Sequence, residues 1–383
     1  MRALSYQGPY SVKVTDKPDP RIEHPQDVVL RVTRSAICGS DLHLLHGLVP
    51  DTRVGCTFGH EFAGVVEEVG SEVRTLSAGD RIVVPFNISC GQCFFCQKGL
   101  TSCCENASAA SDIVSGAFGY SHLTGGYEGG QSQYVRVPYA DVGPMKIPDD
   151  MTEEDVLFLS DIFPTGYQGA EMCELAGGET VIVFGAGPVG LFAMRSAWLL
   201  GAGRVIAVDS VDYRLDFARR FAEVETVNFK EAQDVVALLR EMTGGRGADA
   251  VIDAVGCEAH GKTMDRVTGI HLMLQAGSPT ALTWAIQSVR KGGVVSVIGV
   301  YGPPFNMVPM GDIMNKGLTL RAGQCNVRRY MPRLLEHIRE GRVDAKAIIS
   351  HRFPLEEAPK AYHLFANKLD DCVKCVLMPH GHA

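Results

Sequence analysis

The stretch Val181–Gly190, VIVFGAGPVG, decides the fold of the central part of this chain. A short apolar run leads into Gly185, Gly187 and Gly190, which are spaced as G-x-G-x-x-G. In this pattern the first glycine permits a tight turn, the second lets a pyrophosphate approach the backbone, and the third allows the next helix to pack closely. The stretch therefore predicts a strand, a turn and a helix whose positive N-terminal end binds a dinucleotide.

The residues within and after this motif extend the prediction. Pro188 and Val189 lie between the second and third glycines and belong to the predicted cofactor-binding turn. The next apolar run, RVIAVD, ends at Asp209, about where an acidic residue accepts hydrogen bonds from the ribose hydroxyls. A carboxylate there repels a 2′-phosphate, so NAD is favoured over NADP. Arg214 weakens the preference for NAD over NADP, because its side chain can reach the ribose or a phosphate. The alternative is a set of ordinary turn glycines and a strand-end aspartate.

Outside this motif the chain shows two different patterns of predicted secondary structure. From about residue 171, short apolar runs alternate with helical stretches, which is typical of a parallel sheet with crossover helices. Before about residue 150, short strands are broken by Gly, Pro and Asp, and after about residue 322 two amphipathic stretches precede a closing strand. We therefore predict an α/β protein of two domains: a Rossmann domain with a doubly wound parallel sheet, residues 164–322, and a mostly β domain, residues 1–163 and 323–383.

Composition limits the class of protein. The 383 residues are 46% hydrophobic and 21% charged, as in an ordinary two-domain globular protein, and the net charge of −8 argues against a nucleic-acid or anionic-membrane partner. No apolar run approaches the roughly 20 residues that span a bilayer. The first twenty residues lack the apolar core of a secretory signal, so we expect a cytoplasmic protein. In that reducing compartment, the twelve cysteines are expected to be core thiols and metal ligands rather than disulfides.

The cysteine run CGQCFFCQKGLTSCC predicts a metal site. Two-residue gaps separate Cys90, Cys93 and Cys96, and Cys103 and Cys104 follow after a short loop. Four thiolates close a tetrahedral zinc site with no open position, which makes it structural rather than catalytic. We expect Cys104, rather than Cys103, to be the fourth ligand. The alternatives are a chance cluster of buried cysteines and a nucleic-acid zinc ribbon, and the acidic net charge argues against the ribbon.

A second set of candidate ligands lies in the stretches ICGSDLHLLHG and FGHEFAGVVEEVG. Cys38 and His60 are each next to a glycine, and each is a good zinc ligand. With only three protein ligands the ion would keep the open position that a catalytic zinc requires. Taken singly, such a Cys is more often a buried thiol and such a His a core histidine. Together with the nucleotide motif they favour a catalytic metal site.

These motifs together resemble the zinc-dependent medium-chain dehydrogenase/reductase family, of the alcohol dehydrogenase type, over nearly the whole chain. The resemblance implies a GroES-like fold for the mostly β catalytic domain. It also implies hydride transfer between a small alcohol or aldehyde and NAD, with one catalytic and one structural zinc ion per chain. By the same resemblance the protein is expected to be a homodimer or homotetramer, joined through an edge strand of the nucleotide domain near residues 297–300.

The resemblance also assigns the zinc site. It implies that Cys38 and His60 bind the catalytic zinc, that Asp41 orients a ligand, and that Glu61 lies beside the metal as an occasional extra ligand. The third ligand of the family comes from the segment before the nucleotide domain, where many members have Cys and this sequence has Asp161. That segment, LSDIFPTGYQG, is most similar to the branch of glutathione-independent formaldehyde dehydrogenases, which makes formaldehyde a candidate substrate.

Further roles follow only from the resemblance. Ser40 would take the proton of the substrate hydroxyl, and His43 would pass it toward solvent. Thr165 and Val300 are expected to contact the nicotinamide, and Lys374 is expected to contact the pyrophosphate. Phe86 is expected to form one wall of the substrate pocket. Residues 256–286 resemble an insertion of the same branch that lies against the cofactor in relatives, so NAD is expected to stay bound through purification.

Other interpretations remain open at this stage. The same family contains polyol and threonine-type dehydrogenases, which pocket residues would distinguish. A protein of another class, one that binds metal and nucleotide for regulation without catalysis, would be expected to lack Ser40 or His43, and both are present. Cys372 and Cys375 have a redox-like spacing but fall in the closing strand, so we expect core or surface thiols.

Overall fold

The computed structural model describes residues 1–49, 51–108, 114–256, 279–301 and 308–381. The chain divides into two compact units, Met1–Pro164 with Asn326–Ala383, and Thr165–Cys325. These bounds lie within a few residues of the domain boundaries set from the sequence. Most of the predicted cofactor-side insertion, residues 257–278, lies outside the described residues.

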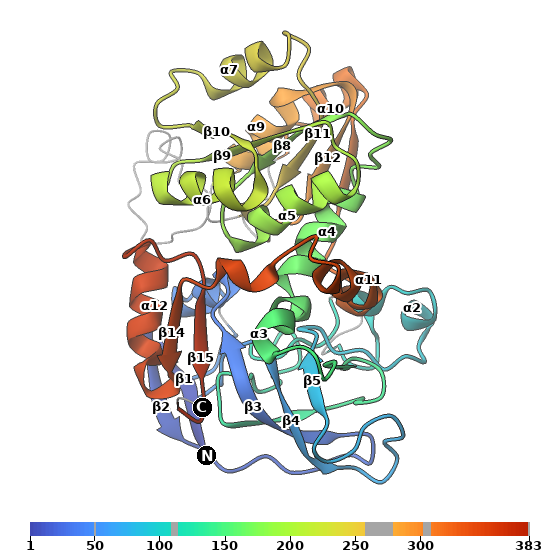
Figure 1. The fold of residues 1–383 in the computed structure, drawn as a ribbon, viewed down its shortest axis with the longest axis vertical. Coiled ribbons are helices and arrows are strands. Elements are labelled where there is room, and N and C mark those ends of the chain that lie inside the picture. The colour runs from blue at the N-terminus through green and yellow to red at the C-terminus, as the bar shows by residue number, and fades with distance from the viewer. Residues whose placement is uncertain (50, 109–113, 257–278, 302–307, 382–383) are drawn as a thin grey trace. The chain divides into compact units, whose positions relative to one another are not determined.

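The unit Thr165–Cys325 is built on a six-stranded parallel sheet in the order β10-β9-β8-β11-β12-β13 (Figure 1). The chain moves outward from β8 to β10 and returns on the other side of β8 with β11. The switch point of the sheet, where ligands of such folds bind, therefore lies between β8 and β11. The strands are β8 (Thr180–Phe184), β9 (Arg204–Asp209), β10 (Glu225–Asn228), β11 (Ala248–Asp253), β12 (Val289–Val297) and β13 (Thr319–Ala322).

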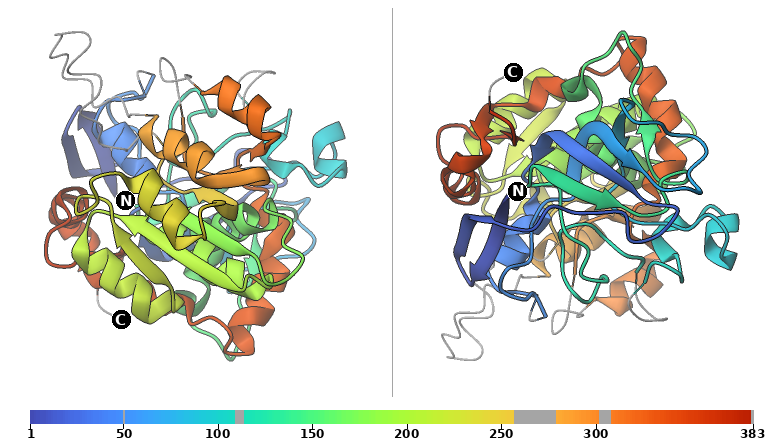
Figure 2. Two further views of the ribbon diagram at one scale, coloured as in Figure 1. Left: turned by 90° about the horizontal axis from the view of Figure 1, so that it is seen from above. Right: turned by 90° about the horizontal axis from the view of Figure 1, so that it is seen from below.

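Helices cover both faces of this sheet (Figure 2). Helix α5 packs against α6, and α7 packs against α9, so the helices form two groups. Their bounds are α5 (Pro188–Leu199), α6 (Asp212–Ala222), α7 (Val235–Met242), α9 (Thr280–Ser288) and α10 (Met310–Lys316). The strands between the helices are almost wholly apolar and buried, as expected when both faces are covered. The predicted doubly wound α/β fold is confirmed.

The expectation about the edge strand of this sheet is wrong. Strand β12, which ends at Val297, lies between β11 and β13 and is hydrogen-bonded on both sides. Its last residue is paired with Ala322 of β13, so no backbone groups of β12 are left there for a second subunit. The outer strand on this side is β13. The oligomeric state stays a prediction.

The other unit is mostly β and is built on a seven-stranded sheet in the order β14-β15-β3-β4-β5-β7, with β6 paired to β3. A separate hairpin of β1 and β2 belongs to the same unit. Two strands from the C-terminal part of the chain thus join strands from its beginning (Figure 1). The strands are β1 (Arg2–Gly8), β2 (Ser11–Asp16), β3 (Val28–Ala36), β4 (Glu61–Val69), β5 (Arg81–Val84), β6 (Tyr134–Val137), β7 (Met145–Lys146), β14 (His351–Pro354) and β15 (Cys375–Met378).

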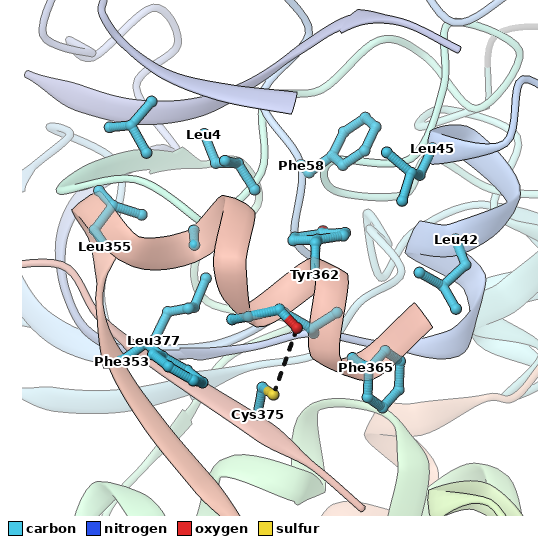
Figure 3. Packing of buried hydrophobic residues seen from close by; sticks show 14 of the residues in the cluster. Leu4, Leu42, Leu45, Phe58, Phe353, Leu355, Tyr362, Phe365, Cys375 and Leu377 are labelled. Carbon is cyan, nitrogen blue, oxygen red and sulfur yellow. Dashed lines mark hydrogen bonds between the residues drawn. The ribbon is translucent and has the colours of Figure 1, made fainter. Parts of the chain in front are cut away.

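The helices of this unit are short, apart from two near the C-terminus. They are α1 (Gly39–Leu45), α2 (Phe94–Gln97), α3 (Glu153–Val156), α11 (Val327–Arg339) and α12 (Ala358–Asn367), and α4 (Ile162–Glu171) crosses the boundary between the units. Tyr362 and Phe365 of α12 pack in one apolar cluster with Phe58 and Leu377 (Figure 3). In the described part of the chain, no helix has both the length and the apolar character needed to cross a membrane.

Candidate active site

Helix α1 carries three of the residues assigned to the site, namely Ser40, Asp41 and His43. Cys38 is the residue before its first turn, and the Asp41 side chain accepts a hydrogen bond from the Cys38 amide at 2.9 Å. This closed cap fixes where the thiol sits relative to the helix. Ser40 and His43 are three residues apart, so they lie on the same side of the helix.

Strand pairing brings the second predicted ligand next to the first. Ala36, at the end of β3, is paired with Glu61, at the start of β4. Cys38 follows the one strand and His60 precedes the other, so the two meet at the same end of the ladder. The pairing of two distant segments thus creates a site that neither segment could form alone.

Asp161 completes this group. Its Oδ2 lies 3.5 Å from Cys38 Sγ and 3.3 Å from His60 Nε2. With Glu61, the donor atoms of the four side chains all lie within 4.8 Å of one another, and all four side chains are buried. Asp161 sits between the turn Leu157–Ser160 and α4, among neighbours in sequence that are fully buried and mostly apolar. A carboxylate in such surroundings needs stabilising partners, and those of Asp161 include a thiol and an imidazole.

The electrostatics of the group suit a cation. Burial and the nearby Asp161 and Glu61 carboxylates raise the pKa of Cys38 to about 11. For His60, burial disfavours the charged ring, but Asp41, Cys38 and Asp161 outweigh it and raise its pKa well above the usual value. Glu61 Oε2 is buried and has no hydrogen-bond partner among the described residues. A sulfur, a nitrogen and carboxylate oxygens in an electronegative pocket fit zinc, which all three kinds of donor bind.

Lys374 has a partner that the sequence did not suggest. Its ammonium donates to Glu61 Oε1 at 2.6 Å, and both side chains are fully buried. The ammonium also lies over the Phe158 ring, 5.6 Å from its centroid. Burial lowers the pKa of Lys374, but Glu61, Cys38 and Asp161 together outweigh burial, so the pKa is raised. The expected contact with a pyrophosphate stays a prediction.

A chain of polar contacts fixes the imidazole of His60. Asp41 Oδ1 lies 3.2 Å from His60 Nδ1, and Gln131 Nε2 donates to Asp41 Oδ2 at 3.1 Å. The Tyr362 hydroxyl in turn donates to Gln131 Oε1 at 2.8 Å. A carboxylate on the far nitrogen of a ligating histidine orients the ring and sets its tautomer. The role expected for Asp41 fits this geometry, whereas Gln131 and Tyr362 carry no motif that could have identified them.

The two residues expected to move a proton lie beside the cluster. Ser40 Oγ is 3.1 Å from His60 Nε2, and His43 Nδ1 is 3.4 Å from the Tyr120 hydroxyl, a contact that the sequence did not suggest. Burial lowers the pKa of His43 to about 4, so its imidazole is neutral near pH 7 and does not hold a proton there. The Phe86 ring meets His60 edge-on, with the ring centroids 6.1 Å apart.

The cysteine run forms a second cluster. The Sγ atoms of Cys90, Cys93, Cys96 and Cys104 all lie within 4.8 Å of one another, whereas Cys103 is exposed and outside the group. Cys90 Sγ accepts hydrogen bonds from two backbone amides, and the Cys96 amide donates to Cys93 Sγ at 3.5 Å. Amide donors stabilise thiolates, so residues 90–104, the cysteine lobe, can hold four thiolates around one ion.

The glycine motif has the geometry that its pattern predicts. Gly185 has a φ of +94°, which favours glycine, and a Cβ at Gly190 would clash with the carbonyl oxygen of Gly185. A Cβ at Gly187 would meet nothing closer than Arg214 Nη1 at 3.7 Å, so the backbone there is open to a ligand. Pro188 is the first residue of α5 and Val189 the second.

Asp209 stands at the end of β9, close to this turn. Its Oδ2 accepts from the Ala186 amide at 2.7 Å, and its Oδ1 accepts from the amides of Ser210 and Val211. These bonds fix the carboxylate beside the glycine turn that follows β8. Thr165 lies in α4 and Val300 follows β12, both half-buried. Their contacts with a nicotinamide stay predictions.

Comparison with known proteins identifies the family. The description "Alcohol dehydrogenase GroES-like domain" matches residues 24–149, and "Zinc-binding dehydrogenase" matches residues 188–271. The chain belongs to the zinc-type alcohol dehydrogenases of the medium-chain dehydrogenase/reductase family. It is therefore an oxidoreductase that uses zinc and a nicotinamide dinucleotide. The cluster with Cys38 and the cluster of Cys90, Cys93, Cys96 and Cys104 fit the catalytic and structural zinc ions of such enzymes.

Three relatives show how far the similarity extends. The zinc-type alcohol dehydrogenase-like protein AdhB of Bacillus subtilis (strain 168) is 47% identical over 383 residues, which cover 99% of this chain and all of that protein. The glutathione-independent formaldehyde dehydrogenase of the same organism is 36% identical, over 92% of this chain and 87% of that one. The solved structure of the alcohol dehydrogenase TADH from Thermus sp. ATN1 is 35% identical, with a TM-score of 0.84 and 99% coverage of both chains.

Proposed function

We propose that this enzyme interconverts a small alcohol and its aldehyde with NAD, at a catalytic zinc ion held by Cys38, His60 and Asp161. The proposal is supported by one observation above all: a thiol, an imidazole and a carboxylate from three separate segments come within 4.8 Å of one another in a buried pocket. Three protein ligands leave the open position that a catalytic zinc needs for substrate.

When bound, the zinc ion supplies a Lewis acid toward the substrate oxygen, and NAD accepts the hydride. Side chains of the protein transfer the proton that the substrate hydroxyl loses. Ser40, 3.1 Å from His60, accepts the proton that the alcohol hydroxyl loses and gives up its own through the ribose of the bound cofactor to His43. Burial lowers the pKa of His43 to about 4, so its imidazole does not hold a proton near pH 7 and would pass one on toward solvent. Phe86 forms an apolar wall beside His60.

Two features support finer assignments. The Asp209 carboxylate at the end of β9 favours NAD, since it would repel a 2′-phosphate and accept from ribose hydroxyls. The aspartate at position 161, and the similarity to a glutathione-independent formaldehyde dehydrogenase, favour formaldehyde as the substrate. A carboxylate makes the metal site harder than the thiolate that many members of the family have there.

The test is to replace Asp161 in the full-length enzyme. Asp161→Ala should release one zinc ion per chain and abolish turnover, while the cysteine lobe keeps its zinc. Asp161→Cys is the matched control, because it restores a thiolate ligand and should keep both the zinc and a measurable rate. Zinc is counted by plasma mass spectrometry, and turnover is followed by NADH absorbance with formaldehyde, ethanol, a polyol and threonine. Full zinc content and full activity in Asp161→Ala would refute the ligand assignment.

A further inference from the structure

A third group of metal-binding side chains lies at the C-terminal end of the chain. The donor atoms of His351, Cys372 and Cys375 lie within 4.8 Å of one another. Strands β14 and β15 run parallel, with His351 opposite Cys375, and the two-residue gap between the cysteines brings their sulfurs to 3.3 Å. Neither the proposed catalytic site nor the cysteine lobe uses these residues.

The spacing of these atoms matches that in the two clusters already described. Two sulfurs of the cysteine lobe are 3.9 Å apart, and His60 Nε2 is 3.3 Å from Asp161 Oδ2. At the C-terminal group the two sulfurs are 3.3 Å apart. Ligands of one zinc ion, at about 2.0–2.3 Å from the metal, are separated by similar distances.

The local backbone holds the group in place. Ser350 Oγ accepts hydrogen bonds from the amides of Val373 and Lys374, which fixes the turn between the two cysteines. His351 Nδ1 lies 2.9 Å from the same hydroxyl. The His351 ring is therefore anchored to the turn that carries both sulfurs. Nε2 is the nitrogen left for an ion, which would displace the exposed Asp370 carboxylate that now lies 3.0 Å from it.

Burial and charge favour an ion over a reactive thiol pair. Both cysteines are fully buried, and Cys375 belongs to the apolar cluster, where its Sγ lies 3.9 Å from the Ala361 carbonyl oxygen (Figure 3). Because solvent does not reach either sulfur, the pair is poorly placed to react with molecules from solution. A divalent ion with two thiolates and a neutral imidazole has no net charge, which avoids the cost of an unpaired buried charge.

The group has an open side. The side chain of His351 is 17% exposed and that of Asp370 is 75% exposed, whereas the sulfurs face the interior. An ion can therefore enter past His351, and a water molecule can fill a fourth position. On binding, each thiol releases one proton to solvent, so one divalent ion replaces two protons.

We propose that His351, Cys372 and Cys375 bind a third zinc ion, separate from the two of the zinc-dehydrogenase family. The site has a structural consequence for the candidate active site. Lys374 lies between the two cysteines, and its ammonium pairs with Glu61. An ion bound here fixes the turn that carries this lysine and so positions Lys374 against Glu61.

The test is the zinc content of the reduced, full-length enzyme after equilibration with zinc and removal of free metal. The wild type should hold three zinc ions per chain and Cys372→Ser/Cys375→Ser one fewer. The matched control is Cys173→Ser, which removes a buried cysteine outside all three groups and should keep all three ions. In Asp161→Ala the third ion should remain, so failure of the catalytic-site assignment would be distinguishable from failure of this one.

A second variant guards against misfolding of the double mutant. His351→Gln changes a partly exposed side chain and should retain the far-ultraviolet circular dichroism of the wild type, while its third zinc ion exchanges into a chelator at least about tenfold faster. Two zinc ions in the wild type, or a zinc content that both variants leave unchanged, would overturn the proposal. So would a Cys372–Cys375 disulfide, detected by mass after thiol blocking, in protein purified under reducing conditions.

Discussion

Lys374 Nζ lies 2.6 Å from Glu61 Oε1, and neither side chain is exposed to solvent. The pair connects the start of β4, beside the candidate zinc ligands, to the turn before β15. A buried charge that loses its partner costs far more than an exposed one, because neither water nor another charge replaces the contact.

The pair predicts a large loss of stability in one single variant. Lys374→Met leaves the Glu61 carboxylate buried and uncompensated, and should lower the free energy of unfolding by about 3–5 kcal/mol. Glu61→Gln/Lys374→Met removes both charges and should recover most of that loss. The urea midpoint of the zinc-loaded protein is the measurement. Lys346→Met, which breaks a half-exposed pair with Asp155, is the matched control and should cost less than about 1 kcal/mol. Equal midpoints for the two lysine variants would contradict the prediction.

The proton-transfer role of Ser40 makes a kinetic prediction. Ser40→Ala removes the hydroxyl beside His60 and should lower kcat by about 10²- to 10⁴-fold, the usual contribution of a positioned acid or base. Zinc content should not change, because serine is not a ligand. Ser40→Thr keeps a hydroxyl and should retain most of the rate. A wild-type kcat in Ser40→Ala would mean that the proton leaves by another route.

The cysteine lobe offers a comparison between neighbours. Cys104 lies in the four-sulfur cluster, whereas Cys103 is exposed and outside it. Cys104→Ser should lose one zinc ion and lower the thermal midpoint, because binding of a structural zinc contributes directly to folding. Cys103→Ser should match the wild type in both measurements. Loss of zinc in Cys103→Ser instead would mean that the wrong cysteine has been assigned.

Cofactor preference provides a test of Asp209. Asp209→Asn keeps an oxygen that accepts from the neighbouring amides but removes the charge that would repel a 2′-phosphate. The ratio of kcat/KM with NAD to that with NADP should fall at least about tenfold, which corresponds to about 1.4 kcal/mol. Glu225→Gln, on the neighbouring strand β10, is the control and should leave the ratio unchanged. An unchanged ratio in Asp209→Asn would contradict the role given to the carboxylate.

Local patterns account for the parts of the site that the sequence predicts. The turn from Gly185 to Gly190 depends on steric limits within six residues, and the spacing of Cys90, Cys93 and Cys96 is set by a short loop. Asp161 could be proposed as a ligand only through the resemblance to a family. The residues next to it in the sequence are mostly apolar, and they give no sign of the thiol and the imidazole that lie close to it in the fold.

Contacts between distant segments account for what the sequence does not predict. Lys374 and Glu61 are 313 positions apart, and a lysine near the end of a chain is ordinarily expected in solvent. His351 meets Cys375 only because β14 and β15 pair in parallel. The sequence does not identify β13 as the edge of the parallel sheet, because its four residues, Thr319–Ala322, are mostly exposed and lack an apolar run.

The last prediction concerns pH and a carboxylate away from the zinc ligands. Glu154, in α3, accepts from Arg352 Nη2 at 2.8 Å and from Arg34 Nε at 3.2 Å. Hydrogen bonding to Arg352 lowers the pKa of Glu154, and Arg34 lowers it further against the effect of burial. The folded state thus favours the ionised carboxylate. Its contribution to stability is complete above the unfolded pKa of about 4.3 and is lost as the pH falls through the lower, folded pKa.

Glu154→Gln tests this sign. The variant should be less stable than the wild type by about 1–2 kcal/mol at pH 7, and the difference should shrink as the pH falls below about 4.3. Urea midpoints of both proteins are compared at each pH, so that any loss of zinc common to both cancels. Glu357→Gln, which removes an exposed partner of Lys360, should differ little from the wild type at any pH. A difference for Glu154→Gln that grows on acidification would mean that the native state favours the protonated carboxyl group.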